Sequence, residues 1–173
     1  MTLLKKQGIG AWISAAALLL AVVGLIIYAV ATNTGNGLIV ASGSQPFYDL
    51  TRAEEAVMIP MVAIFGILSV VGIVASIAAN FFELEGIAGK VVDCVAGVLR
   101  IAVPAFLMLT FLYFVFGSFT GIAWTFFSNA ELEIYPEATA VGQLVIVGLV
   151  LLLVASIASV VAAFLPATKK IED

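Results

Sequence analysis

Four long stretches without a charged side chain dominate this sequence and set what it can fold into. They cover residues 7–48, 56–82, 101–130 and 138–168. A helix needs about 20 mostly apolar residues to cross a bilayer, and each stretch supplies them. The strands of a membrane barrel alternate apolar and polar residues, and these stretches do not. The pattern therefore predicts an all-α integral membrane protein folded as a four-transmembrane-helix bundle.

We expect one domain covering residues 1–173. Within it, the spans are predicted at about residues 9–31, 56–82, 101–127 and 138–166. Composition agrees, because 64% of the residues are hydrophobic and only 10% are charged. Soluble domains average about 45–50% apolar and 25% charged residues. The lipid bilayer is thus the first expected partner. Nucleic acid is excluded, because 7 basic residues against 11 acidic ones leave no basic surface.

The sequence lacks most residues on which enzyme and metal chemistry depends. It contains no histidine and a single cysteine, Cys94. Histidine-dependent catalytic triads, four-ligand Cys/His metal sites and an intrachain disulfide are therefore excluded. No Asp or Glu lies within a predicted span, and no nucleotide-binding glycine loop is present. We predict a protein that is not an enzyme and that has no catalytic residue, metal site or cofactor.

Basic residues favour one side of the predicted membrane. Six of the seven precede span one, separate spans two and three, or follow span four: Lys5, Lys6, Lys90, Arg100, Lys169 and Lys170. Basic loops remain in the cytoplasm, so we predict a multi-pass plasma membrane protein with both termini cytoplasmic. The first span also resembles a secretory signal peptide. Its apolar part exceeds the usual 7–15 residues, so we expect it to be retained.

The segment between spans two and three, residues 84–100, has two distinct faces. Gly86, Lys90, Asp93, Gly97 and Arg100 share one helical face, whereas the opposite face is apolar. The favoured interpretation is a short amphipathic cytoplasmic helix along the membrane surface, followed by a third span beginning at Ile101. Pro104 would then lie in the first turn of that span, where proline is better tolerated. The alternative is one continuous helix that carries Arg100 toward the middle of the bilayer, at a cost of roughly 2.5–3.5 kcal/mol.

Asp93 and Arg100 form the candidate polar site in this segment. Two turns apart on one helical face, they would be a buried ion pair lining a polar path if the helix entered the membrane. At the membrane surface they would instead be an interfacial pair of solvated charges. Only the buried pair would support a transport function.

Small residues at four-residue spacing mark where helices could approach one another closely. The candidate helix-packing positions are Gly72, Ser76, Gly117, Gly121, Ala155 and Ser159. Close packing of this kind drives association in membranes, where no hydrophobic effect acts between helices. Such residues serve either the internal bundle or contacts with another subunit.

These features favour a non-catalytic accessory or scaffold subunit that packs with itself, as a homo-oligomer, or with a partner membrane protein. The alternative function is an oligomeric small-solute channel or transporter component, since four helices alone rarely enclose a water-filled path. That alternative draws on Arg100 with Asp93, on Gln143, and on acidic residues predicted outside the membrane. These acidic residues are Asp49, Glu54, Glu55, Glu131, Glu133 and Glu137.

Overall fold

A computed structural model of the chain describes residues 7–33, 58–81, 86–123, 126 and 136–168. The described part is helical. Its four helices are α2 (Ile9–Asn33), α5 (Met58–Ala79), α6 (Gly86–Ala123) and α7 (Pro136–Phe164). Each is long and apolar enough to span a membrane, as the uncharged stretches predict. The described part of the chain is therefore all-helical and of the multi-pass membrane type.

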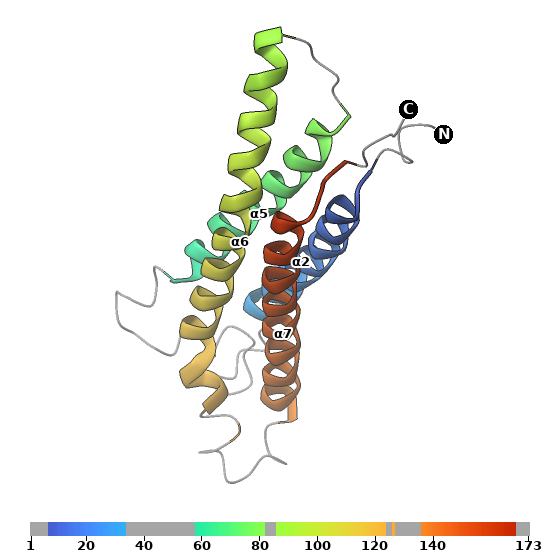
Figure 1. The fold of residues 1–173 in the computed structure, drawn as a ribbon. Helices are drawn as coiled ribbons and strands as arrows, with labels where there is room; N and C mark the ends of the chain where they lie inside the picture. Colours follow the sequence, from blue (N-terminus) through green and yellow to red (C-terminus); the bar gives the residue numbers. More distant parts are fainter. Residues whose placement is uncertain (1–6, 34–57, 82–85, 124–125, 127–135, 169–173) are drawn as a thin grey trace.

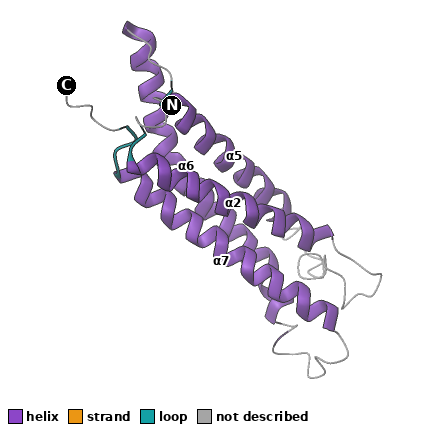
Figure 2. Ribbon diagram, turned by 90° about the vertical axis from the view of Figure 1, so that its right-hand side faces the viewer, coloured by secondary structure: helices purple, strands orange, loops and turns teal. Residues whose placement is uncertain are grey.

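The helices form a bundle in which chain direction alternates from one helix to the next (Figure 1). α2 packs chiefly against α7, and α5 packs chiefly against α6. Contacts between α6 and α7, and fewer between α2 and α5, join the two pairs. The view in Figure 2 shows the same side-by-side arrangement from a second direction. The start of α2 and the end of α7 lie at one end of the bundle, the end at which α5 finishes and α6 begins (Figure 1).

α6 differs from the helix boundaries that the sequence favours. No separate amphipathic helix precedes the third span, because residues 86–100 form the first turns of a continuous 38-residue helix. Pro104 lies inside this helix instead of in its first turn. A proline removes one backbone hydrogen bond, and the neighbours of a bundled helix can compensate for that loss. The continuous-helix alternative therefore describes the backbone correctly.

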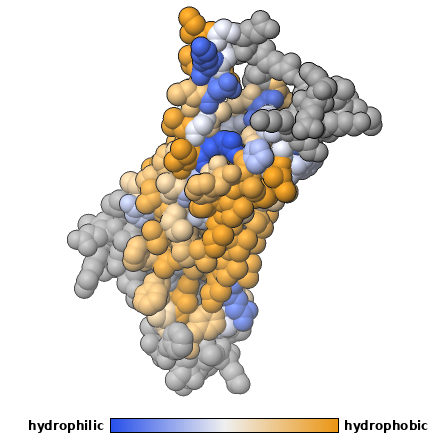
Figure 3. All heavy atoms as spheres, viewed as in Figure 1, coloured by the Kyte–Doolittle hydropathy of each residue, from blue (hydrophilic) through white to orange (hydrophobic). Residues whose placement is uncertain are grey.

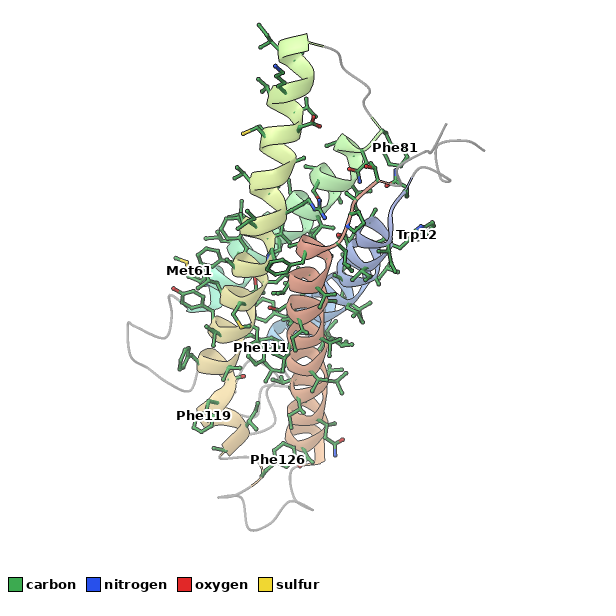
Figure 4. All side chains as sticks on the ribbon, in the orientation of Figure 1. Trp12, Met61, Phe81, Phe111, Phe119 and Phe126 are labelled. Carbon is green, nitrogen blue, oxygen red and sulfur yellow. The ribbon has the colours of Figure 1, made fainter. Side chains whose placement is uncertain are left out.

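Two groups of apolar side chains fill the bundle. The larger is centred on Phe114, whose ring meets that of Tyr28 edge to face at a centroid distance of 5.2 Å. The smaller joins all four helices through Ala21, Ile73, Val103 and Ala155, with Leu107. Aromatic edge-to-face pairs add about 0.5–1.5 kcal/mol beyond the area that they bury. Figure 4 shows Phe111, which packs on the larger group, between α6 and α7.

The outer surface of the bundle is mainly apolar. Large apolar side chains with more than half of their surface exposed occur on all four helices, including Leu19, Ile67, Phe116 and Ile157. Figure 3 shows apolar residues covering the middle of the visible face, with most of the hydrophilic ones nearer the end at which α2 begins and α7 ends. A soluble protein rarely exposes such an area, whereas lipid covers it at no cost.

Candidate functional site

Polar groups gather where α2 begins and α7 ends, and we call this region the terminal junction (residues 7–14 and 159–168, with Arg100 of α6). The two chain segments run antiparallel there, with a bridge between Gln7 and Thr168. The backbone N–H of Gly8 donates to the carbonyl of Ala167 at 2.7 Å. These bonds satisfy backbone groups that the helix ends would otherwise leave without partners.

Glycine allows this close approach at the start of α2. A Cβ atom on Gly10 would lie 2.7 Å from the carbonyl oxygen of Leu165 and 3.0 Å from that of Pro166. The N–H of Gly10 donates to the same Pro166 oxygen at 3.0 Å. Any side chain at this position would therefore collide with backbone atoms, which cannot rotate away.

Arg100 joins α6 to the terminal junction. Its guanidinium Nη2 donates to the carbonyl oxygen of Ala162 at 2.9 Å and also to that of Leu165. Ala162 lies in the last turn of α7 and Leu165 directly follows the helix end, where carbonyls have no α-helical partner. The carbonyl oxygen of Ala162 also accepts from the backbone N–H of Leu165 at 3.3 Å. The cation also faces the negative end of the α7 dipole. Arg100 thus caps α7 from a neighbouring helix.

A small cavity lies beside the guanidinium. Its lining includes Arg100 and three serines, Ser14, Ser76 and Ser159. The three hydroxyls donate to carbonyl oxygens of their own helices, at 2.9, 3.0 and 2.7 Å respectively. The cavity measures about 10 Å³, which is at the lower limit for one water molecule. The hydroxyl oxygen of Ser156 is buried and has no hydrogen-bond partner in the described part of the chain.

The structure does not bring Asp93 and Arg100 together. The side chain of Asp93 is exposed, whereas Arg100 is half-buried and turned toward α7. No ion pair joins these two residues. Gln143, the other polar residue on which the transport hypothesis draws, is exposed on α7. The polar residues proposed for a path therefore do not line a common one.

Several of the candidate packing residues are buried where helices contact one another. Gly72 is buried against α6, since a Cβ there would lie 2.7 Å from Val103 Cγ2. Ala155 belongs to the smaller core group, and Ser76 and Ser159 are buried beside Arg100. Gly117 is buried in α6. The surroundings of Gly121 lie outside the described residues, as do those of the predicted outer acidic side chains.

Besides Gly10, sequence reasoning missed three glycines that allow close contacts between helices. A Cβ on Gly24 would lie 2.9 Å from Leu152 Cγ, and one on Gly148 would lie 2.8 Å from Ile27 Cγ2. These two positions let α2 and α7 approach reciprocally. Gly66 of α5 faces Leu25 of α2. Each is an isolated glycine whose partner is a large side chain, so a search for paired small residues passes over it.

No group of three or more histidine, cysteine, aspartate or glutamate side chains is placed to hold a metal ion within the described ranges. The terminal junction supplies hydrogen-bond donors to backbone carbonyls and holds α2, α6 and α7 together. Comparison with protein-family models, with curated proteins and with solved structures finds no match to this chain.

Proposed function

We propose that this protein is a non-catalytic membrane subunit that acts as an accessory or scaffold, packing through its helices with copies of itself or with a partner membrane protein. The observation that carries the proposal is the role of Arg100. Its guanidinium is engaged by two backbone carbonyls at the end of α7.

The character of the bundle interior supports this function. The buried core of the described helices is made of apolar side chains and of hydroxyls bonded mostly within their own helices. The space beside Arg100 is about 10 Å³, so it admits no solute larger than water. An oligomeric small-solute channel, the alternative function, would have to build its path between subunits.

The mass of the protein in mild detergent tests the proposal. We expect a complex of defined size, clearly above the 18.0 kDa of one chain, either as a homo-oligomer or with another membrane protein. Proteoliposomes containing the purified chain should release no more of a small trapped solute than empty vesicles do. A strictly monomeric protein, or solute release that depends on the inserted chain, would contradict the scaffold function.

The proposal includes an orientation, with both termini and the start of α6 in the cytoplasm and the protein in the plasma membrane. Trp12 and Phe126 lie near opposite ends of the bundle (Figure 4), as aromatic residues at two membrane surfaces do.

Cysteine labelling in intact cells should place residues 43 and 129 outside. We expect Gly43→Cys and Asn129→Cys, each in a Cys94→Ser background, to react with a membrane-impermeant maleimide. The native Cys94, exposed on the first turns of α6, should react only after the cells are opened. Labelling of Cys94 in intact cells would reverse the orientation and leave the bundle unchanged.

A further inference from the structure

The small cavity beside Arg100 is lined by one polar side chain from each of the four helices. These are Ser14 of α2, Ser76 of α5, Arg100 of α6 and Ser159 of α7, and the rest of the lining is apolar. Ser76 and Ser159 are almost fully buried, with 8% and 5% of their surface exposed. We call this space the four-helix cavity. Its polar lining distinguishes it from the apolar core around it.

Arg100 has hydrogen-bond donors that the protein does not use. A guanidinium carries five N–H groups. Nη2 donates to the carbonyl oxygens of Ala162 and Leu165. The three N–H groups on Nε and Nη1 have no hydrogen-bond partner among the described residues. A buried donor without an acceptor costs free energy, most of all when it is charged. An acceptor in the four-helix cavity lies beside this side chain.

The three serines offer acceptors to the same space. Each hydroxyl already donates its single hydrogen to a carbonyl oxygen of its own helix, at 2.9 Å for Ser14, 3.0 Å for Ser76 and 2.7 Å for Ser159. A hydroxyl oxygen also has two lone pairs. With its hydrogen committed to the helix, each oxygen remains free to accept. The cavity thus combines a donor from one helix with acceptors from the other three.

Pro104, which also lines the cavity, leaves a further acceptor on α6. Proline has no N–H, so the carbonyl oxygen of Arg100, four residues earlier, receives no α-helical hydrogen bond. Ordered water is one of the groups that satisfy backbone carbonyls freed by proline in membrane helices. A donor at this turn therefore lowers the cost of a helix that continues through Pro104.

Size and chemistry together select the ligand. The cavity measures about 10 Å³, which is about the space that one water molecule needs. Its occupant must accept from the guanidinium and donate to hydroxyl oxygens. A simple anion only accepts and an ammonium ion only donates, whereas water does both. Water is also at hand, because the cavity lies toward the end of the bundle where hydrophilic residues gather (Figure 3).

We infer that the four-helix cavity is a binding site for a single water molecule, which accepts from Arg100 and donates to the serine hydroxyls. The hydroxyl of Ser76 donates only within α5, so the water links α5 to the guanidinium at this level. The water also completes the hydrogen bonding of a cation that lies between four helices. The site goes beyond the scaffold function, because a single chain contains all of it.

Nuclear magnetic resonance of the protein in detergent micelles tests the site directly. The chain has two arginines, Arg52 and Arg100, so ¹⁵N-arginine labelling of the Arg52→Lys variant leaves one Nε–H signal. We expect a cross peak between this proton and water, with opposite signs in NOE and ROE spectra. Opposite signs identify water that stays bound while the protein tumbles. Exchange of the proton itself gives the same sign in both spectra.

Variants of α5 show whether the bound water occupies the four-helix cavity. Ser76→Val replaces the hydroxyl with a methyl group and adds a second one, so it should abolish the cross peak. Ser76→Ala removes one hydrogen-bond partner and should weaken it. Ser69→Ala is the matched control, because Ser69 is also buried on α5 and donates within that helix, yet it does not line the cavity. It should leave the cross peak unchanged.

Three results would overturn the water site. The first is a folded wild-type protein whose Arg100 Nε–H shows no cross peak to long-lived water. The second is a cross peak of unchanged intensity in both Ser76 variants while their amide spectra stay dispersed, which would place the water outside the cavity. The third is a saturable shift of the Nε–H signal with added fluoride or chloride, which would make the ligand an anion.

Discussion

Replacing Arg100 with methionine should lower the free energy of unfolding by about 3 kcal/mol. The substitution removes two charge-assisted hydrogen bonds, to the carbonyl oxygens of Ala162 and Leu165, each of a class worth about 1.5–3 kcal/mol. It also leaves the carbonyl end of α7 without a cation. Methionine keeps much of the apolar stem, so the loss reports on the guanidinium. Unfolding in mixed micelles, followed by circular dichroism, measures the change.

Two further variants show that the effect belongs to this position. Lys90→Met removes the other cation of α6, whose side chain is exposed, and should change stability by less than about 0.5 kcal/mol. Arg100→Lys keeps the charge near the end of α7 but lacks the planar fork that reaches two carbonyls, so we expect an intermediate loss. Equal losses in Lys90→Met and Arg100→Met would show that α6 needs charge in general and that α7 is not capped by Arg100.

The number of spanning helices follows directly from the sequence because it depends on local composition. Uncharged apolar stretches locate α2, α5 and α7 to within a few residues of their structural ends. The start of α6 does not follow in the same way. Pro104 and the polar face of residues 84–100 favour a break near Arg100, whereas the helix continues through both. Sequence rules for proline assume a helix in water, and neighbouring helices change its cost.

Helical periodicity cannot predict the partner of Arg100, because it relates only residues of the same helix. Periodicity places Asp93 on the same face two turns away, and it makes no statement about α7. The guanidinium instead binds carbonyls at the C-terminal end of α7, more than 60 residues along the chain. One general signal was present, because the final carbonyls of every helix need partners. Choosing among four helix ends requires the tertiary arrangement.

Introducing a single methyl group at residue 10 should also destabilise the fold, by about 2 kcal/mol. Alanine is the better helix former, by about 1 kcal/mol in a helix interior, so local propensity predicts a gain for Gly10→Ala. The structure predicts a loss, because the new Cβ would meet the backbone oxygens of Leu165 and Pro166 at 2.7 and 3.0 Å. Separating the segments would also weaken the Gly10 N–H bond to Pro166.

Gly97→Ala is the matched control, because it makes the same change on α6. A Cβ at Gly97 would have no atom within 4 Å, so only propensity acts and stability should rise by up to about 1 kcal/mol. The two substitutions are therefore expected to change stability in opposite directions in the same micelle titration. A gain at both positions would mean that the start of α2 does not rest on the end of α7 in the membrane.

Gly10 and Arg100 act on the same turn of α7, and this makes their effects interdependent. The Cβ of Gly10→Ala would lie 3.1 Å from the carbonyl oxygen of Ala162, which also accepts from Arg100. Once that turn has lost its cap, it can move away from a new methyl group at little further cost. The double variant Gly10→Ala/Arg100→Met should thus lose at least about 0.5 kcal/mol less than the sum of the single losses. Strict additivity would show that α2 and α6 hold the end of α7 independently.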